Sequence, residues 1–109
     1  MKSVKIYSAD GMVYGKCWGG GFGGYPAERL DGYDSQEALI KEATEMLDDG
    51  SLDSGMGFEY LKGALLSIKE TEEIIIKGKL FTSEEYEMVY IGDLTEEEEI
   101  QLEEWTYNY

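Results

Sequence analysis

The side chains best able to do chemistry in this sequence are its carboxylates. Asp and Glu number 24 against 9 Lys and Arg, which gives a net charge of −15, and there is no histidine. Acid–base catalysis by two carboxyl groups, as in glycoside hydrolysis, needs them about 5–9.5 Å apart across a cleft, with burial raising the pKa of one. Because no spacing singles out such a pair, the sequence predicts a protein that is not an enzyme.

Residues 80–109 concentrate the negative charge. They contain ten carboxylates and no Lys or Arg, since every cation lies at or before Lys79. Such a field repels nucleic acid and anionic membranes and attracts basic surfaces. Tyrosine and tryptophan lie among the acids, and these residues are frequent interface anchors. The predicted partner-binding residues are Glu84, Glu85, Tyr86, Glu87, Tyr90, Asp93, Glu96, Glu97, Glu99, Glu103, Glu104 and Trp105.

The spacing of these acids bears on what they could bind. On a strand, Glu85 and Glu87 lie on one face roughly 6.6 Å apart, and on a helix Glu99 and Glu103 lie roughly 5–6 Å apart between Cβ atoms. Rows of carboxylates on rigid elements can imitate duplex DNA, which carries one charge per ~1.7 Å of its axis. The alternative is that the run 96–99 only caps and solubilises a helix while the tyrosines pack on the sheet.

The glycine-rich segment 19–24, GGGFGG, contains the spacing G-x-G-x-x-G of dinucleotide-binding loops. That fingerprint requires a helix that opens directly after it and holds the pyrophosphate. Tyr25-Pro26 follows instead, so we expect no cofactor here. A recognition loop carrying Trp18, Phe22 and Tyr25 remains an alternative to a loop whose aromatic rings fold back on the sheet.

Asp48, Asp49 and Asp53 surround a glycine turn in a way that could attract calcium. The twelve-residue spacing of an EF-hand is absent, however. The sequence therefore predicts no metal site.

Three features favour a cytoplasmic protein. Cys17 is the single cysteine of the sequence, so no internal disulfide can form, which suits a reducing compartment. No apolar run reaches the ~18 residues of a membrane span, and the N-terminus lacks the apolar core of a signal peptide. Without a histidine to activate it, Cys17 is expected to be a small buried residue.

A sheet is expected to position these residues. The segment 63–93 is rich in β-branched and aromatic residues, with Gly78 and Gly92 at its joints, which is typical of consecutive antiparallel strands. Before it, residues 51–62 are expected to form a loop and a short turn, with the next strand beginning at Ala64. The spacing of Phe58, Leu61, Leu65 and Ile68 would also suit a helix, which is the alternative for residues 56–68.

At the N-terminus, residues 2–7 and 12–18 are expected to pair as a hairpin around Asp10-Gly11, a favoured type I′ turn. With the elements that follow, this predicts a single α+β domain over residues 1–109. Its antiparallel sheet should have four to six strands in the approximate order ββαβββα.

Two helices are expected to pack on this sheet. The first spans residues 35–49, with Asp34 as N-cap, Glu37 completing a capping box and an apolar stripe for one face of the sheet. Thr95 and Glu98 form a second capping box, which predicts a short C-terminal helix packed at an end of the sheet.

In size, acidity, absence of histidine, single cysteine and mixing of tyrosine with carboxylates, the chain resembles a group of small acidic proteins of phages and mobile elements. These are anti-defence proteins of the anti-CRISPR or DNA-mimic antirestriction type. The resemblance is one of composition over the whole chain and includes no motif. It implies an inhibitor that occupies the nucleic-acid channel of a defence nuclease.

Two hypotheses follow. In the first, the chain is a non-enzymatic binding protein whose acidic C-terminal third occupies a basic, nucleic-acid-binding surface of a partner protein, without binding nucleic acid or a membrane itself. In the second, it is a structural or assembly module that forms hetero-oligomers or a homodimer through a sheet edge, with its acidity serving solubility.

Overall fold

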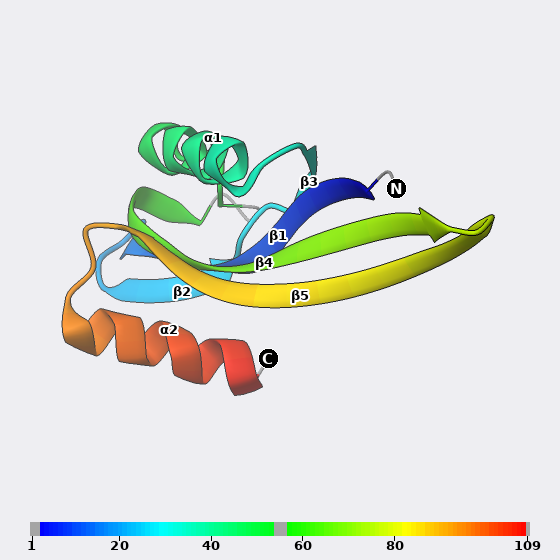
Figure 1. Cartoon of the computed structure of the whole chain (residues 1–109). Coiled ribbons are helices and arrows are strands. Elements are labelled where there is room, and N and C mark those ends of the chain that lie inside the picture. Colours follow the sequence, from blue (N-terminus) through cyan, green and yellow to red (C-terminus); the bar gives the residue numbers. More distant parts are fainter. Residues whose placement is uncertain (1–2, 54–56, 109) are drawn as a thin grey trace.

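The structure, a computed structural model, describes residues 3–53 and 57–108. These residues form an α+β fold, with five strands in one curled antiparallel sheet and two helices (Figure 1). The elements are β1 (Ser3–Cys17), β2 (Phe22–Pro26), β3 (Leu30–Tyr33), α1 (Gln36–Asp49), β4 (Phe58–Ile76), β5 (Lys79–Gly92) and α2 (Glu96–Asn108). The predicted fold class is confirmed, but three strands precede α1 and two follow it, so the order is βββαββα and not ββαβββα.

The sheet is built around β4. Its strand order is β2-β1-β4-β5, with β3 pairing beside β2 on the same edge of β1. Because β1, β4 and β5 are long, the molecule is elongated, with principal extents of 59 × 26 × 21 Å. The sheet twists strongly along this axis (Figure 1).

The hairpin expected at Asp10-Gly11 is wrong, because β1 runs through both residues without turning. Asp10 and Gly11 pair with Ser67 and Leu66 of β4, in a ladder that spans the whole of β1. A Cβ at Gly11 would overlap the backbone of β4. The glycine therefore permits close approach of the two strands, a situation that favours glycine as a turn also does. Lys2, the first residue of the expected strand, lies outside the described residues.

The segment after Gly63 forms two long strands instead of several short ones. A two-residue turn at Lys77-Gly78 joins β4 to β5, with φ of 51° and 78°. Positive φ at both positions is typical of a type I′ turn, whose twist matches that of the flanking strands. The strand also begins earlier than expected, at Phe58 instead of Ala64. Residues 54–56 of the expected loop lie outside the described part of the chain.

Helix α1 covers one face of the sheet. Leu39, Ala43 and Leu47 are buried against a cluster that includes Leu66 and Ile68 of β4, so the predicted apolar stripe is confirmed. The N-cap, however, lies one residue later than expected. The expected capping box of the helix is therefore wrong. Glu37 stands at the second helical position, whereas a capping box requires the glutamate at the third.

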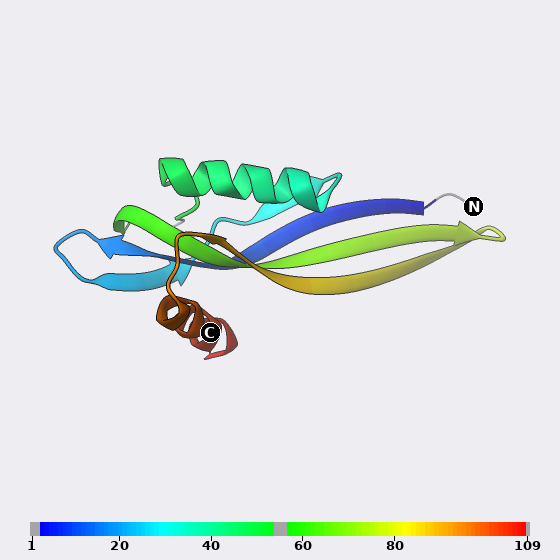
Figure 2. The same cartoon turned by 60° about the vertical axis from the view of Figure 1, so that its left-hand side comes forward.

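Helix α2 lies on the opposite face and not at an end of the sheet (Figure 2). Leu102 is fully buried against Met12, Tyr14 and Leu65. Alternate residues of β4 therefore supply two separate cores, since Leu65 faces α2 while its neighbours face α1. The helix continues through residues 107–108, which were expected to trail off; residue 109 lies outside the described chain.

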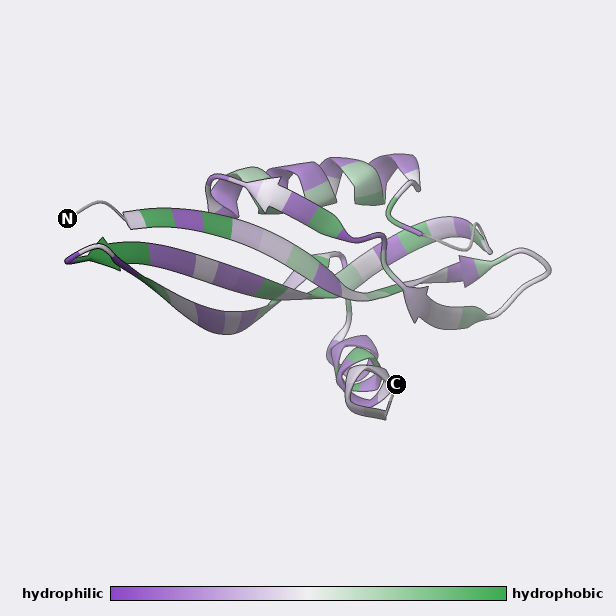
Figure 3. Cartoon of the chain, turned by 90° about the vertical axis from the view of Figure 1, so that its right-hand side faces the viewer, coloured by the Kyte–Doolittle hydropathy of each residue, from purple (hydrophilic) through white to green (hydrophobic). Residues whose placement is uncertain are grey.

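Beyond the two helices, the end of the β4–β5 hairpin is open on both faces. Figure 3 shows apolar residues gathered at this end. Ile75, Leu80 and Phe81 are 58%, 61% and 52% exposed. Half of the sheet is thus a packed scaffold, and the other half is an arm without a covering layer among the described residues.

Candidate protein-binding surface

The first turn of α2 is tied to the sheet by Glu98. The Thr95 Oγ1 atom accepts a hydrogen bond from the Glu98 amide at 3.3 Å, and the Glu98 Oε1 atom accepts one from the Thr95 amide at 2.9 Å. This confirms the second predicted capping box. From β4, the Lys62 Nζ atom donates to both Glu98 carboxylate oxygens at 2.8 Å. Sequence reasoning missed Lys62 because it lies 36 residues away, in a segment expected to be a loop.

Lys62 and Glu98 hold each other in the charged state. Burial by itself would raise the pKa of Glu98, but the hydrogen bonds from Lys62 and Thr95 outweigh it and keep that pKa below 4.5. The hydrogen bond to Glu98 raises the pKa of Lys62 above 10.5. Since Glu98 is only 8% exposed, this carboxylate is removed from the acidic surface of α2.

A stack of three aromatic rings holds the second half of α2 on the sheet. Trp105 stacks on Tyr14 of β1, with centroids 6.0 Å apart, and Tyr14 stacks on Phe22 of β2 at 5.8 Å. The Lys62 Nζ atom lies 5.4 Å from the centroid of the Phe22 ring, within cation–π range. Trp105 also packs over Gly24, where a Cβ would overlap its ring. The half-buried Trp105 is therefore engaged within the chain.

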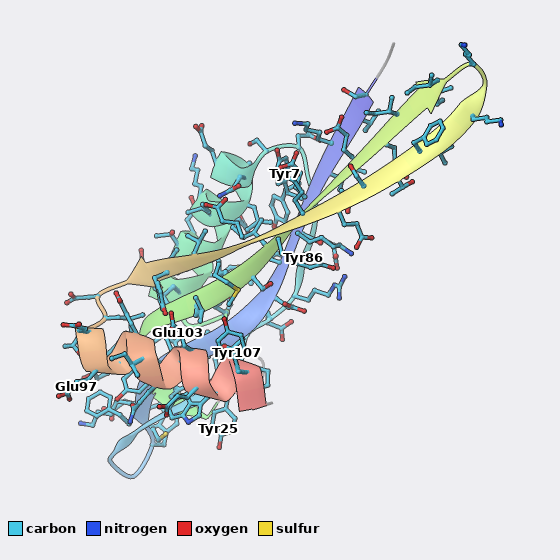
Figure 4. All side chains as sticks on the ribbon, turned by 60° about the horizontal axis from the view of Figure 1, so that its bottom comes forward. Tyr7, Tyr25, Tyr86, Glu97, Glu103 and Tyr107 are labelled. Atoms are coloured by element: carbon cyan, nitrogen blue, oxygen red, sulfur yellow. The ribbon has the colours of Figure 1, made fainter. Side chains whose placement is uncertain are left out.

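Tyr90 joins β5 to α2 on the same face. Its hydroxyl donates to the Glu103 Oε1 atom at 2.6 Å and lies 3.3 Å from the carbonyl oxygen of Glu99. Burial and then the hydrogen bond to Glu103 raise the pKa of Tyr90, so its hydroxyl stays protonated and remains a donor. This contact orients Glu103, which Figure 4 shows on α2.

The outer surface of α2 is rich in carboxylates, with Ile100 and Tyr107 also exposed on it. Glu96, Glu97, Glu103 and Glu104 are exposed, and Glu99 is half-buried. At about 100° per residue, Glu96, Glu99 and Glu103 lie along one flank of this surface and Glu97 and Glu104 along the other, with the exposed Ile100 between them. Figure 4 places Glu97 at the start of the helix. Among the described residues, no ion pair joins these five to a Lys or Arg. We call Glu96, Glu97, Glu99, Glu103 and Glu104 the α2 acidic surface.

The carboxylates of β5 are divided between the two faces of the sheet. Glu84 and Tyr86 share the parity of Tyr90 and face the side of α2, and the Tyr86 hydroxyl donates to Glu84 at 3.2 Å. Glu85 and Glu87 face the side of α1, where Glu87 accepts a hydrogen bond from Gln36 at 3.0 Å. The predicted partner-binding set is thus not one continuous surface.

On the side of α1, Glu85 and Glu87 line a shallow hollow of about 260 Å³ together with Glu70. Lys5 lies 3.1 Å from Glu70 and lowers the negative charge beside the hollow. Within the described part of the chain, no group of three or more His, Cys, Asp or Glu residues is arranged to hold a metal ion.

Asp93 lies exposed between β5 and α2, where its amide donates to the Lys62 carbonyl oxygen at 2.8 Å. It follows directly on the strand and precedes the capping box of α2. Of the predicted partner-binding residues outside α2, Asp93 is therefore the nearest in sequence to the α2 acidic surface.

The three aromatic residues in and beside the glycine-rich segment, Trp18, Phe22 and Tyr25, point in different directions. Residues 18–21 form the turn between β1 and β2, and Trp18 in that turn is 68% exposed. Phe22 joins the stack under α2, whereas Tyr25 contacts Phe58 on the side of α1, with ring centroids 5.3 Å apart. Cys17, beside the turn, is half-buried against the core on the side of α1.

Over residues 3–53 and 57–108, neither helix combines the length and apolar character needed to cross a membrane. No protein-family model matches the sequence, and no match was found among curated proteins or solved structures. The charge distribution and the geometry of α2 are therefore the basis for a functional proposal.

Proposed function

We propose that this chain is a non-enzymatic acidic inhibitor that docks the α2 acidic surface, with Asp93 beside it, on a basic nucleic-acid-binding surface of a partner protein. One observation carries this proposal. Five carboxylates lie on the outer side of one helix and have no ion-pair partner among the described residues, while the sixth, Glu98, is buried with Lys62. Carboxylates that served solubility alone would not need such a fixed platform.

The platform supports the proposal because it reduces the entropy lost on binding. Helix α2 is held at its start by Glu98, at its centre by Leu102 and near its end by Trp105. Groups that are already ordered before association lose less conformational freedom when a partner binds.

The density of the charges limits the extent of any DNA mimicry. Thirteen helical residues span roughly 20 Å, so five carboxylates give about one charge per 4 Å, against one per ~1.7 Å for duplex DNA. The α2 acidic surface therefore replaces a short run of phosphates and suits a small basic site. Glu84 and Tyr86 lie on the same side of the sheet, further along β5.

The test is capture of partners from a host lysate with the tagged chain at low and high salt, followed by mass spectrometry. The resemblance to anti-defence proteins makes defence nucleases the first partners to examine. We expect basic nucleic-acid-binding proteins that are released by salt and by added duplex DNA. Neutralising Glu96, Glu97, Glu103 and Glu104 to Gln should abolish this capture.

A matched control changes four exposed carboxylates on or near α1, with Glu28, Glu37 and Glu45 changed to Gln and Asp48 to Asn. The net charge is then the same in both variants, and only its position differs. Equal loss of capture in both variants would show that total charge, and not α2, attracts the partner. Partners that are neutral or acidic and insensitive to salt would contradict the proposal outright.

A second candidate role, assembly through a sheet edge, is favoured by a separate observation. Among the described strands, β5 has a partner on one side only, β4. An edge strand presents unpaired backbone groups that can pair with another chain.

A further inference from the structure

The charges at the exposed end of β5 are arranged symmetrically about Thr82. Lys77 and Lys79 lie five and three residues before it, and Glu85 and Glu87 lie three and five residues after it. Lys79, Glu85 and Glu87 are all odd-numbered residues of β5, so their side chains belong to one face of the strand, and Lys77 lies in the turn beside it. Two antiparallel copies of this strand centred on Thr82 would therefore place each cation opposite an anion.

The backbone of β5 permits this register. In a two-residue hairpin the residues that flank the turn, Ile76 and Lys79, form a hydrogen-bonded pair. Alternation then directs the amides and carbonyls of odd-numbered β5 residues toward β4 and those of even-numbered residues toward the outer edge. Asp93 continues this ladder, and its amide donates to the Lys62 carbonyl oxygen of β4. Its odd number agrees with the assignment of odd-numbered residues to the β4 side. Thr82 thus offers its backbone groups to the outer edge.

We propose that two copies of the chain pair through the outer edges of β5, antiparallel and with a two-fold axis at Thr82. In this arrangement Thr82 forms a hydrogen-bonded pair with its own copy. Lys79 stands opposite Glu85 of the second copy in a non-hydrogen-bonded pair, the type in which side chains are closest. Lys77, in the turn, lies toward Glu87 of the second copy.

Other registers fit less well. A two-fold axis at Glu84 or Glu85 would set that carboxylate directly opposite itself, and like charges in this position are destabilising. The axis at Thr82 avoids every like-charged pair between residues 77 and 87. The interface thus has a preferred register that is set by charge.

The end of the hairpin also supplies apolar surface. Leu80 and Phe81 are 61% and 52% exposed, and Phe81 would stand opposite Ser83 of the second copy, diagonal to the second Phe81. Residues 74–83 contain two lysines and no carboxylate, although the chain as a whole carries −15. The pairing therefore joins the least acidic part of one copy to the acidic segment of the other and leaves α2 free.

A charge swap measured by sedimentation equilibrium tests the proposal at constant salt. Wild type should show a concentration-dependent dimer. Lys79→Glu or Glu85→Lys alone should weaken it by about tenfold or more, because two opposite-charge pairs become like-charge pairs. The double variant Lys79→Glu/Glu85→Lys should restore it. Wild type that stays monomeric, or a double variant no tighter than the single ones, would overturn the proposal.

Two further variants test the edge and the register. Thr82→Pro removes an amide that points away from β4, so the monomer should fold while the dimer is lost; a folded variant that still dimerises would exclude this edge. In a Cys17→Ser background, Thr82→Cys should form a disulfide between the two copies on oxidation. Ser83→Cys should not, since the Cα atoms of residue 83 in the two copies would lie roughly 7–8 Å apart, beyond disulfide range. The reverse result would overturn the register.

Discussion

Lys62 and Glu98 connect the centre of the sheet to the first turn of α2. The Lys62 Nζ atom lies 2.8 Å from both carboxylate oxygens, and the side chains are 25% and 11% exposed. The same carboxylate accepts the amide of Thr95 and so completes the helix N-cap. One residue of the acidic run thus positions the helix, and its neighbours are left to face solvent.

Glu98→Gln should destabilise the chain by roughly 1–3 kcal/mol, the usual effect of removing a hydrogen bond to a charged group that is partly buried. Glutamine can still complete the capping box, so the loss reports on the contact with Lys62. Urea unfolding gives the measurement. Glu97→Gln, one residue earlier and exposed, is the control and should change stability by less than about 0.5 kcal/mol.

The stabilisation by Glu98 should depend on pH in a defined way. Its pKa is lower in the folded chain than the ordinary 4.5, so the stabilisation is complete above that value and is lost as the pH falls through the lowered pKa. At the alkaline end, the raised pKa of Lys62 means that the stabilisation is lost as the pH rises through a value above 10.5. The difference in unfolding free energy between wild type and Glu98→Gln should therefore be constant between these limits. A difference that grew in acid would contradict this assignment.

Gly24→Ala should loosen the second half of α2. A Cβ at this position would overlap the Trp105 ring, and overpacking of this kind typically costs about 1–3 kcal/mol. Tryptophan fluorescence in a Trp18→Phe background, where Trp105 alone reports, should shift to longer wavelength as the ring becomes more exposed. At Gly23 a Cβ would meet only the Cys17 Sγ atom at 3.5 Å, an ordinary contact, so Gly23→Ala should leave the emission unchanged.

The two aspartates at the end of α1 should respond in opposite directions to neutralisation. The last turn of α1 contains no basic residue, so Asp48→Asn should stabilise the chain by about 0.3–1 kcal/mol at low salt and by less at high salt. Asp49 accepts a hydrogen bond from the Ser51 amide at 2.8 Å, so Asp49→Ala, which removes the acceptor with the charge, should destabilise the turn. Thermal unfolding at two salt concentrations would separate the two effects, and stabilisation by both changes would be contrary to this account.

Ser35→Ala should destabilise α1 by about 1 kcal/mol, because the Ser35 Oγ atom accepts the Ala38 amide at 3.1 Å. Asp34→Ala should have little effect, although the sequence favours Asp34 as the cap. Chemical unfolding of the two variants compares them directly. The opposite ranking would place the cap at Asp34.

Local signals predicted several elements of this fold. The apolar stripe of α1, the capping box at Thr95 and the turn at Gly78 each depend on residues close together in the sequence, so the α+β class could be predicted from them. The Asp10-Gly11 dipeptide misled for a physical reason. Glycine is favoured both where a chain turns and where two strands approach closely, and only the partner strand distinguishes the two.

The sequence by itself determined that residues 80–109 are acidic without a cation, and that most of them lie on a strand and a helix. Only the tertiary structure decided which carboxylates share a surface. Alternation along β5 sends Glu84 to the side of α2 and Glu85 to the side of α1, and the packing of Leu102 and Trp105 selects the side of α2 that faces solvent. Lys62, which lies 36 residues before Glu98 in the sequence, forms an ion pair with it and so withdraws this carboxylate from that surface. Pairing register and the choice of sheet face depend on contacts between distant segments, which local composition does not specify.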